Sequence, residues 1–256
     1  MYQTLHVQYQ SQSCLVTLNC PKNYNKVTPE LIYELHAVLD EIESKANNRL
    51  LILQGKSGIF CAGMDLEVAS KDSAKIASGA YMHLLRRFAT IPRVIVAKVV
   101  GTVIAGGVGL VAASDLVIAT PESQFSLSEA LWGLLPCCVA PYLIRRIGFQ
   151  AAYRLALTTS PITAEEAYRI QLVDTLSVTP DEILKQFIAR FSRLEVKTLA
   201  ELKSYFRKLW IITEEMEAMA VAEITRLMQT TLVQHNLNQY ANEKRFPWEK
   251  EEMCCD

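Results

Sequence analysis

The sequence predicts an α/β protein built around a mainly parallel sheet. Two observations lead to this expectation: short strand patterns alternate with helical patterns, and half of the 256 residues are apolar while 21% are charged. A chain of this length and composition buries a substantial core. Its 26 basic and 27 acidic residues give a net charge of −1, so there is no basic field to attract nucleic acid.

The individual elements follow from periodicity and from helix-start signals. Residues 28–30 open the first helix, because Thr28 is a suitable N-cap and proline suits the first helical position. A second helix is expected over residues 105–114, whose small uncharged side chains allow tight packing. Apolar residues recur at the helical period in the first helix, as Leu31, Leu35, Val38, Leu39 and Ile42. Strands are expected at residues 5–9, 14–18, 50–53, 94–100, 116–119 and 172–173.

The pattern of apolar residues changes toward the C-terminus, because it follows the helical period almost continuously over residues 180–235. We therefore expect a core with the active site over residues 1–196 and a helical region over residues 197–256. The apolar positions of the helical region, such as Met216 and Met219, exceed what one face of a solitary helix needs. A subunit interface would bury this surplus.

The cysteines and the N-terminus indicate a cytoplasmic protein. Seven cysteines, including two adjacent pairs, do not form the framework of a secreted disulfide protein, and none has zinc-ligand spacing. The four histidines also lack companions at metal-ligand spacing, so no metal site is expected. The N-terminus lacks the profile of a signal peptide, and no uncharged stretch is long enough to span a membrane.

Two glycine-containing segments are the first candidates for chemistry. One is Phe60-Cys61-Ala62-Gly63-Met64-Asp65-Leu66, which follows a strand and is expected to open a helix; the other is Ile104-Ala105-Gly106-Gly107-Val108-Gly109-Leu110. Each offers exposed backbone N–H groups where a ligand can approach closely. Two such donors pointing at one carbonyl oxygen would form an oxyanion hole. Tight helix packing explains the same glycines equally well.

The order of these motifs, followed by Ser114-Asp115 and by residues 125–133 with an internal glutamate, resembles the crotonase (enoyl-CoA hydratase/isomerase) superfamily. The resemblance covers nearly the whole chain. It implies a crotonase-type ββα spiral core with C-terminal helices that assemble a trimer or hexamer. It also implies that the backbone amides of Met64 and Gly106 stabilise a thioester enolate.

The resemblance implies that Glu129 is the principal acid and base. Hydratases of this family typically hold two glutamates, and here the first position is Gly109 while the second is Glu129. The apolar residues around Glu129 favour a raised carboxyl pKa, although a carboxylate in the first turn of a helix capped by Ser128 would explain Glu129 as well. Asp65 is a candidate helper for the departing hydroxyl, against the simpler interpretation of a helix-start residue.

Four further residues are predicted to contact the substrate. Cys138 lies in a Pro-Cys-Cys-Val-Ala-Pro segment that would reshape the acyl pocket, and no histidine lies near it in sequence to make it a nucleophile. Tyr81 and His83 could line the pocket as hydrogen-bond donors, unless they are ordinary exposed helix residues. By resemblance, Lys22 keeps a common contact to the phosphate of coenzyme A or phosphopantetheine.

A finer resemblance concerns the dehydratases of polyketide β-branching. It rests on the Gly109 replacement, on the run Pro-x-Cys-Val-x-Pro at residues 136–141 with Leu-Ile-Arg-Arg-Ile-Gly at residues 143–148, and on the terminal Phe246-Pro247-Trp248-Glu249. It implies dehydration of 3-hydroxy-3-methylglutaryl-ACP to 3-methylglutaconyl-ACP, with an acyl carrier protein as partner and no metal or redox cofactor. Arg145, Arg146 and Arg154 are possible docking charges for that acidic partner. The alternatives are a Δ3,Δ2-enoyl-thioester isomerase and a non-catalytic scaffold of the same fold.

Overall fold

A computed structural model describes residues 2–56, 58–65, 71–210 and 212–249. Its strands are β1 (Leu5–Tyr9), β2 (Ser13–Leu18), β3 (Leu50–Gln54), β4 (Ile59–Cys61), β5 (Val94–Val99), β6 (Thr102–Ile104), β7 (Leu116–Ala119), β8 (Gln124–Ser126), β9 (Ile162–Thr163) and β10 (Thr175–Leu176). Its helices are α1 (Pro29–Ser44), α2 (Lys71–Thr90), α3 (Gly106–Ala113), α4 (Ala140–Ile147), α5 (Phe149–Thr158), α6 (Ala164–Arg169), α7 (Pro180–Phe191), α8 (Val196–Lys208), α9 (Glu214–Met228) and α10 (Thr231–Glu243). Two 3-10 turns, η1 (Pro21–Asn23) and η2 (Glu129–Trp132), complete the described elements.

Two sheets form the centre of the molecule, and both are mainly parallel, as predicted. The larger sheet has the order β1-β2-β3-β5-β7-β10, with only the β1–β2 pair antiparallel. The smaller sheet has the order β4-β6-β8-β9, with the first three strands parallel. Because β4 and β6 are neighbours in the smaller sheet, the chain segments that follow them leave from the same edge. These are the two glycine segments.

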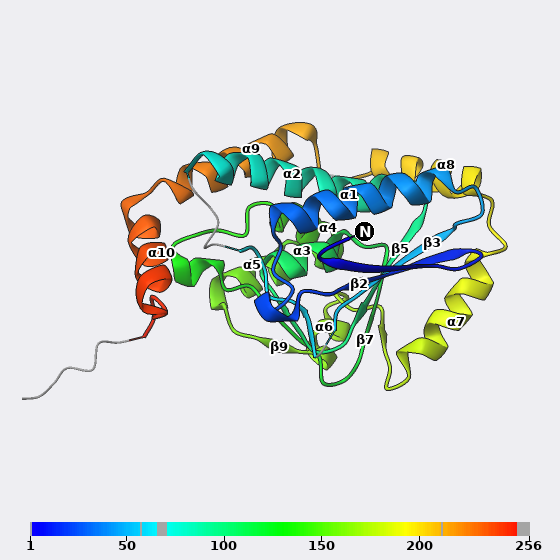
Figure 1. Ribbon diagram of the computed structural model, residues 1–256, viewed down its shortest axis with the longest axis horizontal. Coiled ribbons are helices and arrows are strands. Elements are labelled where there is room, and N and C mark those ends of the chain that lie inside the picture. Colours follow the sequence, from blue (N-terminus) through cyan, green and yellow to red (C-terminus); the bar gives the residue numbers. More distant parts are fainter. Residues whose placement is uncertain (1, 57, 66–70, 211, 250–256) are drawn as a thin grey trace, which may run out of the picture.

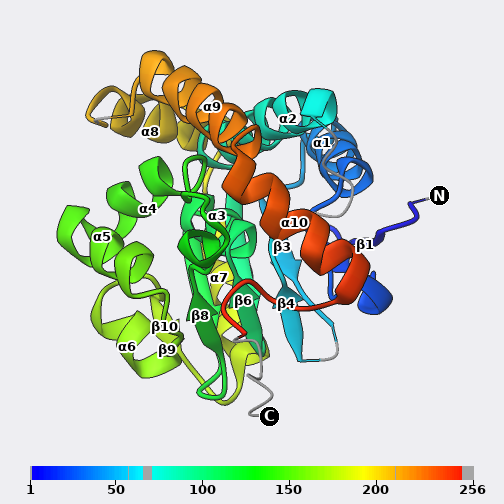
Figure 2. The same cartoon turned by 90° about the vertical axis from the view of Figure 1, so that its left-hand side faces the viewer.

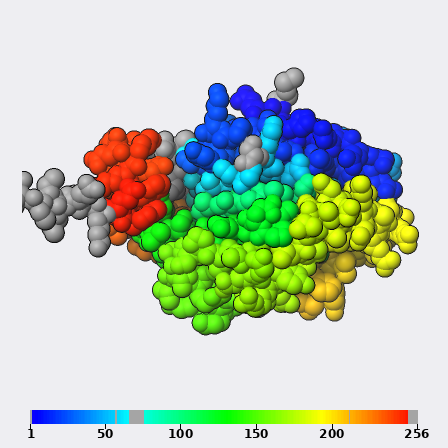
Figure 3. Space-filling model, turned by 90° about the horizontal axis from the view of Figure 1, so that it is seen from below, coloured from blue at the N-terminus to red at the C-terminus, as the bar shows by residue number. Residues whose placement is uncertain are grey.

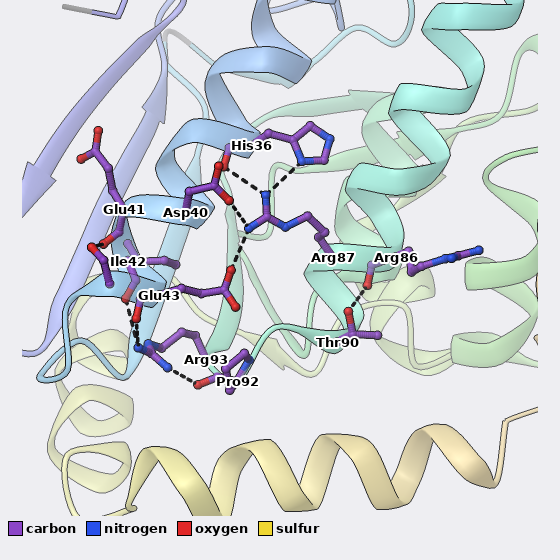
Figure 4. A network of polar contacts seen from close by, with 11 residues as sticks. His36, Asp40, Glu41, Ile42, Glu43, Arg86, Arg87, Thr90, Pro92 and Arg93 are labelled. Atoms are coloured by element: carbon purple, nitrogen blue, oxygen red, sulfur yellow. Dashed lines mark hydrogen bonds and ion pairs between the residues drawn. The ribbon is translucent and has the colours of Figure 1, made fainter.

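Helices α1 and α2 lie side by side over the larger sheet, and α9 packs along α2 (Figure 1). Thr28 caps α1 by accepting a hydrogen bond from the Leu31 amide, as predicted. Figure 4 shows how α1 is tied down: the guanidinium of Arg87 contacts Asp40 at 2.7 Å, and Arg93 donates to the carbonyl oxygen of Ile42 at 3.1 Å. Arg93 thereby satisfies carbonyl groups that the end of α1 leaves free.

The predicted strand at residues 172–173 is wrong. The amides of Leu172 and Val173 both donate to the carbonyl oxygen of Ala167, in a turn that closes α6, and the strand lies at β10 beside β7. The two side chains are apolar because the turn packs them into the core.

The predicted helical C-terminus consists of α7 to α10. The space-filling view shows α10, in red, at one end of the molecule (Figure 3). Helix α8 starts at Val196, next to the predicted boundary, and the division of the chain there stays a prediction. Among the described residues, no helix is both long and apolar enough to cross a bilayer.

Candidate active site

The two glycine segments cross directly, which brings Met64 and Gly106 together. Gly63 has φ +87°, and a Cβ atom on it would lie 2.9 Å from the Cβ of Ala105 and 3.5 Å from the Gly106 nitrogen. Only glycine combines that conformation with so close an approach. A methyl group placed on Gly106 would lie 3.5 Å from the Met64 nitrogen. The Met64 amide and the first turn of α3 therefore border one small space.

The local backbone leaves both amides free to bind. Gly106 is the first residue of α3, so its N–H has no acceptor within the helix. The preceding Ala105 has φ 49° and ψ −116°, a strained conformation held by its hydrogen bond to the Ser126 carbonyl oxygen at 2.8 Å. Among the described residues, no hydrogen-bond acceptor is seen for the Met64 N–H. Such free, fixed donors are what an oxyanion hole requires.

Met64 is held by neighbouring extended backbone. It pairs with Val27 in a parallel bridge, and the Asp65 amide donates to the Val27 carbonyl oxygen at 3.0 Å. The described part of helix α2 runs from Lys71, and the predicted helix start after Asp65 falls at residues 66–70, outside the described part of the chain. The bridge to Val27 thus orients the Met64 donor.

Glu129 begins the 3-10 turn η2, three residues after Ser126 of β8. Its Oε2 atom is fully enclosed, and among the described residues no hydrogen-bond partner is seen for it. Burial raises the pKa of the Glu129 carboxyl to about 7, partly opposed by the nearby backbone amides. In the alternative interpretation Ser128 caps a helix with Glu129 in its first turn; Glu129 does lie in the first turn of η2, but the Ser128 side chain makes no capping hydrogen bond. A carboxyl group in this state can accept and return a proton at neutral pH.

Tyr81 of α2 contacts Gly106 and lies within the electrostatic reach of Glu129. Its hydroxyl donates to the Gly106 carbonyl oxygen, and its side chain is 2% exposed. A Cβ atom on Gly109 would lie 2.2 Å from that hydroxyl. Burial, with the nearby charge of Glu129 as a smaller cause, raises the pKa of Tyr81 well above its usual value. Tyr81 is therefore a neutral hydroxyl at the wall of the site.

Asp65 follows Met64 directly, and the chain after η1, which carries Lys22, pairs with the Met64 segment at Val27. The carboxylate of Asp65 lies 3.5 Å from the Lys26 ammonium, so it has a structural partner in addition to any catalytic role. Asn25, 1% exposed, fixes this segment by donating to the Ile59 carbonyl oxygen at 3.0 Å. Lys22 lies exposed on η1 at the open end of the same segment.

Cys138 is buried beside Tyr81, with its sulfur 3.9 Å from the Ser78 carbonyl oxygen of α2. Burial raises the pKa of the Cys138 thiol to about 12, so the thiol is neutral and serves only to line the site.

His83 does not lie with the other candidate site residues. It stacks on His36 of α1 with ring centroids 5.0 Å apart and borders a groove of about 690 Å³ between α2 and α9. Two residues along a helix point about 200° apart, which separates His83 from Tyr81.

Two of the three arginines considered for partner docking, Arg145 and Arg146, form hydrogen bonds inside the protein. Arg145 donates to the Ala112 carbonyl oxygen at 2.7 Å, and Arg146 donates to that of Ser114 at 2.9 Å. Burial lowers the pKa of both guanidinium groups, as expected for cations held inside the protein. They join α4 to the end of α3 and do not form a surface for an acidic partner.

Comparison with known proteins agrees with this geometry. The family model described as Enoyl-CoA hydratase/isomerase matches residues 8–251. The chain belongs to the enoyl-CoA hydratase/isomerase family. It is therefore an enzyme with the crotonase fold, and the scaffold alternative is not supported.

Several members of this family resemble the chain over most of its length. Bacillaene synthase dehydratase PksH of Bacillus subtilis is 34% identical over 97% of both chains. The crystal structure of PksH from Bacillus subtilis superimposes with a TM-score of 0.88, at 31% identity, covering 96% of this chain and 100% of that one. Enoyl-CoA hydratase EchA19 of Mycobacterium tuberculosis is 33% identical over 68% of both chains.

Three features of this crotonase site were not predicted. The contact between Tyr81 and Gly109 joins residues from different elements, and no sequence pattern specifies it. The Asn25 hydrogen bonds are equally non-local. The strained conformation of Ala105 has no signal in its residue type, because left-handed backbone normally favours glycine or asparagine.

Proposed function

We propose that this enzyme removes water from a 3-hydroxyacyl thioester. The observation that carries the proposal is the enclosed carboxyl group of Glu129, whose pKa is raised to about 7 and whose charge acts on Tyr81, the residue that donates to Gly106 beside the Met64 amide. Elimination from a 3-hydroxyacyl thioester needs a base for the α-proton and donors for the carbonyl oxygen. These residues supply both groups.

The proposed reaction balances as a proton transfer and a loss of water. The carboxylate of Glu129 takes the proton from the α-carbon, and the electron pair of the C–H bond moves to the thioester oxygen, where the Met64 and Gly106 N–H groups stabilise the charge. The enolate then re-forms the carbonyl, the C–O bond at the β-carbon breaks, and the hydroxyl leaves with the proton held by Glu129. Asp65 assists through a water beside the departing hydroxyl. The proposed elimination requires no redox step and no metal ion.

The substrate we propose is 3-hydroxy-3-methylglutaryl-ACP, converted to 3-methylglutaconyl-ACP. The support is the similarity to the PksH dehydratase over 97% of both chains, together with the motif resemblance to β-branching dehydratases. An acyl carrier protein would present the acyl group on phosphopantetheine. Lys22, exposed on η1 near the Met64 segment, would contact its phosphate. This partner, and the free thiols of the five cysteines in the described part, fit a cytoplasmic enzyme.

Mass spectrometry of the carrier-bound acyl group tests this assignment. The enzyme is mixed with 3-hydroxy-3-methylglutaryl-ACP, with the same acyl group on coenzyme A, and with a 3-enoyl-ACP. The proposal predicts loss of one water from the first substrate and slower turnover of the coenzyme A form. Double-bond migration in the 3-enoyl-ACP without any water loss from the hydroxyacyl substrates would identify an isomerase instead.

The proposed enzyme is an oligomer, a trimer or hexamer. Helix α8 exposes several large apolar side chains, and α9 adds further ones. The exposed apolar residues of these two helices, with Leu209 directly after α8, are Leu202, Tyr205, Phe206, Leu209, Met216 and Met219. Burying them against copies of the chain would remove them from water. Light scattering coupled to size-exclusion chromatography should give three or six times the 28.8 kDa mass of the chain; a monomer at micromolar concentration would contradict this.

A further inference from the structure

The turn that carries Glu129 is too short to be stable through its own hydrogen bonds. Turn η2 has only four residues, from Glu129 to Trp132, and Gly133 ends it in a left-handed conformation. A single 3-10 turn makes few internal hydrogen bonds and is only marginally stable without support. The position of the Glu129 carboxyl therefore depends on what packs against η2.

Helix α10 provides that support from a distant part of the chain. The side-chain amide of Asn236 donates to the Trp132 carbonyl oxygen at 3.0 Å, across 104 residues, and Asn236 is buried. A Cβ atom on Gly133 would lie 3.1 Å from Leu232 and 3.3 Å from Val233. The backbone of η2 thus lies directly against α10, which crosses that end of the molecule (Figure 2).

An aromatic cluster completes the contact. The Trp132 ring meets Tyr240, Trp248 and Phe246 edge-on, with centroid distances of 5.2, 5.7 and 6.0 Å. Phe246 and Trp248 stack on each other at 4.8 Å, and the Phe246 amide donates to the carboxylate of Glu249 at 2.8 Å. Each edge-to-face pair adds stabilisation beyond the area that it buries. The rings of Trp132, Tyr240 and Phe246 belong to an apolar cluster distinct from the main core, and Trp248 packs on two of them.

We propose that α10 and residues 244–249 form a C-terminal clamp that holds the Glu129 carboxyl at the reaction site, with Trp132 and Asn236 as positioning residues. This inference rests on the proposed function, in which Glu129 moves the proton. The clamp holds the turn at its last residue, Trp132, and at Gly133 directly after it, so loosening it would let η2 move and admit water to the enclosed Oε2 atom. The carboxyl would then lose both its alignment and its desolvated setting.

The Asn236→Ala variant tests the clamp, and Asn238→Ala is its matched control. Asn238 is exposed two residues along the same helix, so its replacement keeps the helix while leaving η2 untouched. We expect Asn236→Ala to lower kcat by about tenfold or more with little change in KM, because a misplaced proton carrier affects the chemical step. Trp248→Ala, at a partly exposed ring, should act in the same direction without opening a cavity in the main core.

The decisive readout is the ionisation of Glu129 itself, measured by NMR titration of 13C-labelled glutamate in the resting full-length enzyme. The Glu129→Gln variant assigns the signal. The clamp predicts that Asn236→Ala moves the pKa from about 7 toward 4.5, whereas Asn238→Ala leaves it in place. Tyr81 and Cys137 are groups on which the charge of Glu129 acts, and burial, the larger cause, raises the pKa of both and keeps them neutral over this range.

The outcomes separate the clamp from the proposed function. A lower melting temperature with unchanged kcat and an unchanged Glu129 pKa in Asn236→Ala would mean that α10 is merely structural, and would overturn the clamp. An active Glu129→Gln enzyme would instead overturn the proposed function, whatever Asn236→Ala does.

Discussion

The hydroxyl of Tyr81 occupies the space that any side chain on Gly109 would need. A Cβ atom at position 109 would lie 2.2 Å from that hydroxyl oxygen and 3.3 Å from the ring carbon that carries it. Non-bonded heavy atoms do not approach to 2.2 Å, so a side chain at position 109 would have to displace the Tyr81 hydroxyl from its place beside Gly106. The observed position of Tyr81 thus requires a glycine here, and Glu129 is the enclosed carboxyl of the site.

This relationship predicts non-additive stability changes. Gly109→Ala alone should lower the free energy of unfolding by about 1–3 kcal/mol, because the new methyl group displaces the Tyr81 hydroxyl. In Tyr81→Phe/Gly109→Ala the nearest remaining ring atom lies 3.3 Å away, so most of that loss should return. Denaturant unfolding of the four proteins in the cycle measures the coupling. Strictly additive effects would show that the two positions are not in contact.

The raised pKa of Glu129 predicts the pH dependence of activity. The carboxylate form is the base, so kcat/KM should rise with pH and reach half its maximum near pH 7, with a tenfold fall for each unit below that. Initial rates of water loss between pH 5 and 9 measure this limb. An inflection near 4.5 would show that the group is solvated in the working enzyme.

Ionisation of the buried Glu129 carboxyl should lower the free energy of unfolding as the pH rises. The pKa of this carboxyl is about 7 in the folded protein against an ordinary value of 4.5, so the loss is absent below pH 4.5, grows between the two values, and is complete above pH 7. Glu129→Gln removes the charge at nearly constant shape. It should stabilise the protein by up to about 3 kcal/mol at pH 8 and hardly at all at pH 4. Thermal unfolding at both pH values checks the sign.

A buried ion pair attaches α8 to the core. The Lys203 ammonium lies 2.6 Å from the Asp115 carboxylate and also donates to the carbonyl oxygens of Phe88 and Arg93. Lys203→Met should lower the free energy of unfolding by about 3 kcal/mol or more, because it leaves Asp115 without its cation. The control is Lys197→Met on the same helix, where the side chain is 88% exposed. Two separate unfolding transitions in the wild-type enzyme would show instead that residues 197–256 fold independently.

The sequence allowed prediction of what depends on local pattern. The cap of α1 at Thr28, the parallel strands and the helical C-terminus follow from periodicity and residue type, and the glycine segments follow from the need for close backbone approach. The resemblance then selected Glu129 among many carboxylates. The local pattern was insufficient at residues 172–173, where the apolar side chains lie in a buried turn before β10.

Contacts between distant segments could not be predicted in this way. His83 and Tyr81 are similar candidates along the sequence, and only the packing of α2 separates them. The Trp132–Asn236 hydrogen bond spans 104 residues and depends on how α10 folds back. Each of these contacts is a property of tertiary structure, for which a single sequence carries no periodic signal.

Exchange of the substrate's α-proton in deuterated water tests the role of Glu129 most directly. The wild-type enzyme, Glu129→Gln and Asp65→Asn are incubated with 3-hydroxy-3-methylglutaryl-ACP, and deuterium incorporation and water loss are followed by mass spectrometry. We predict that Glu129→Gln loses both by a factor of about 100 or more while still binding the acyl carrier, and that Asp65→Asn retains exchange but loses water more slowly. Undiminished deuterium incorporation by Glu129→Gln would contradict the account.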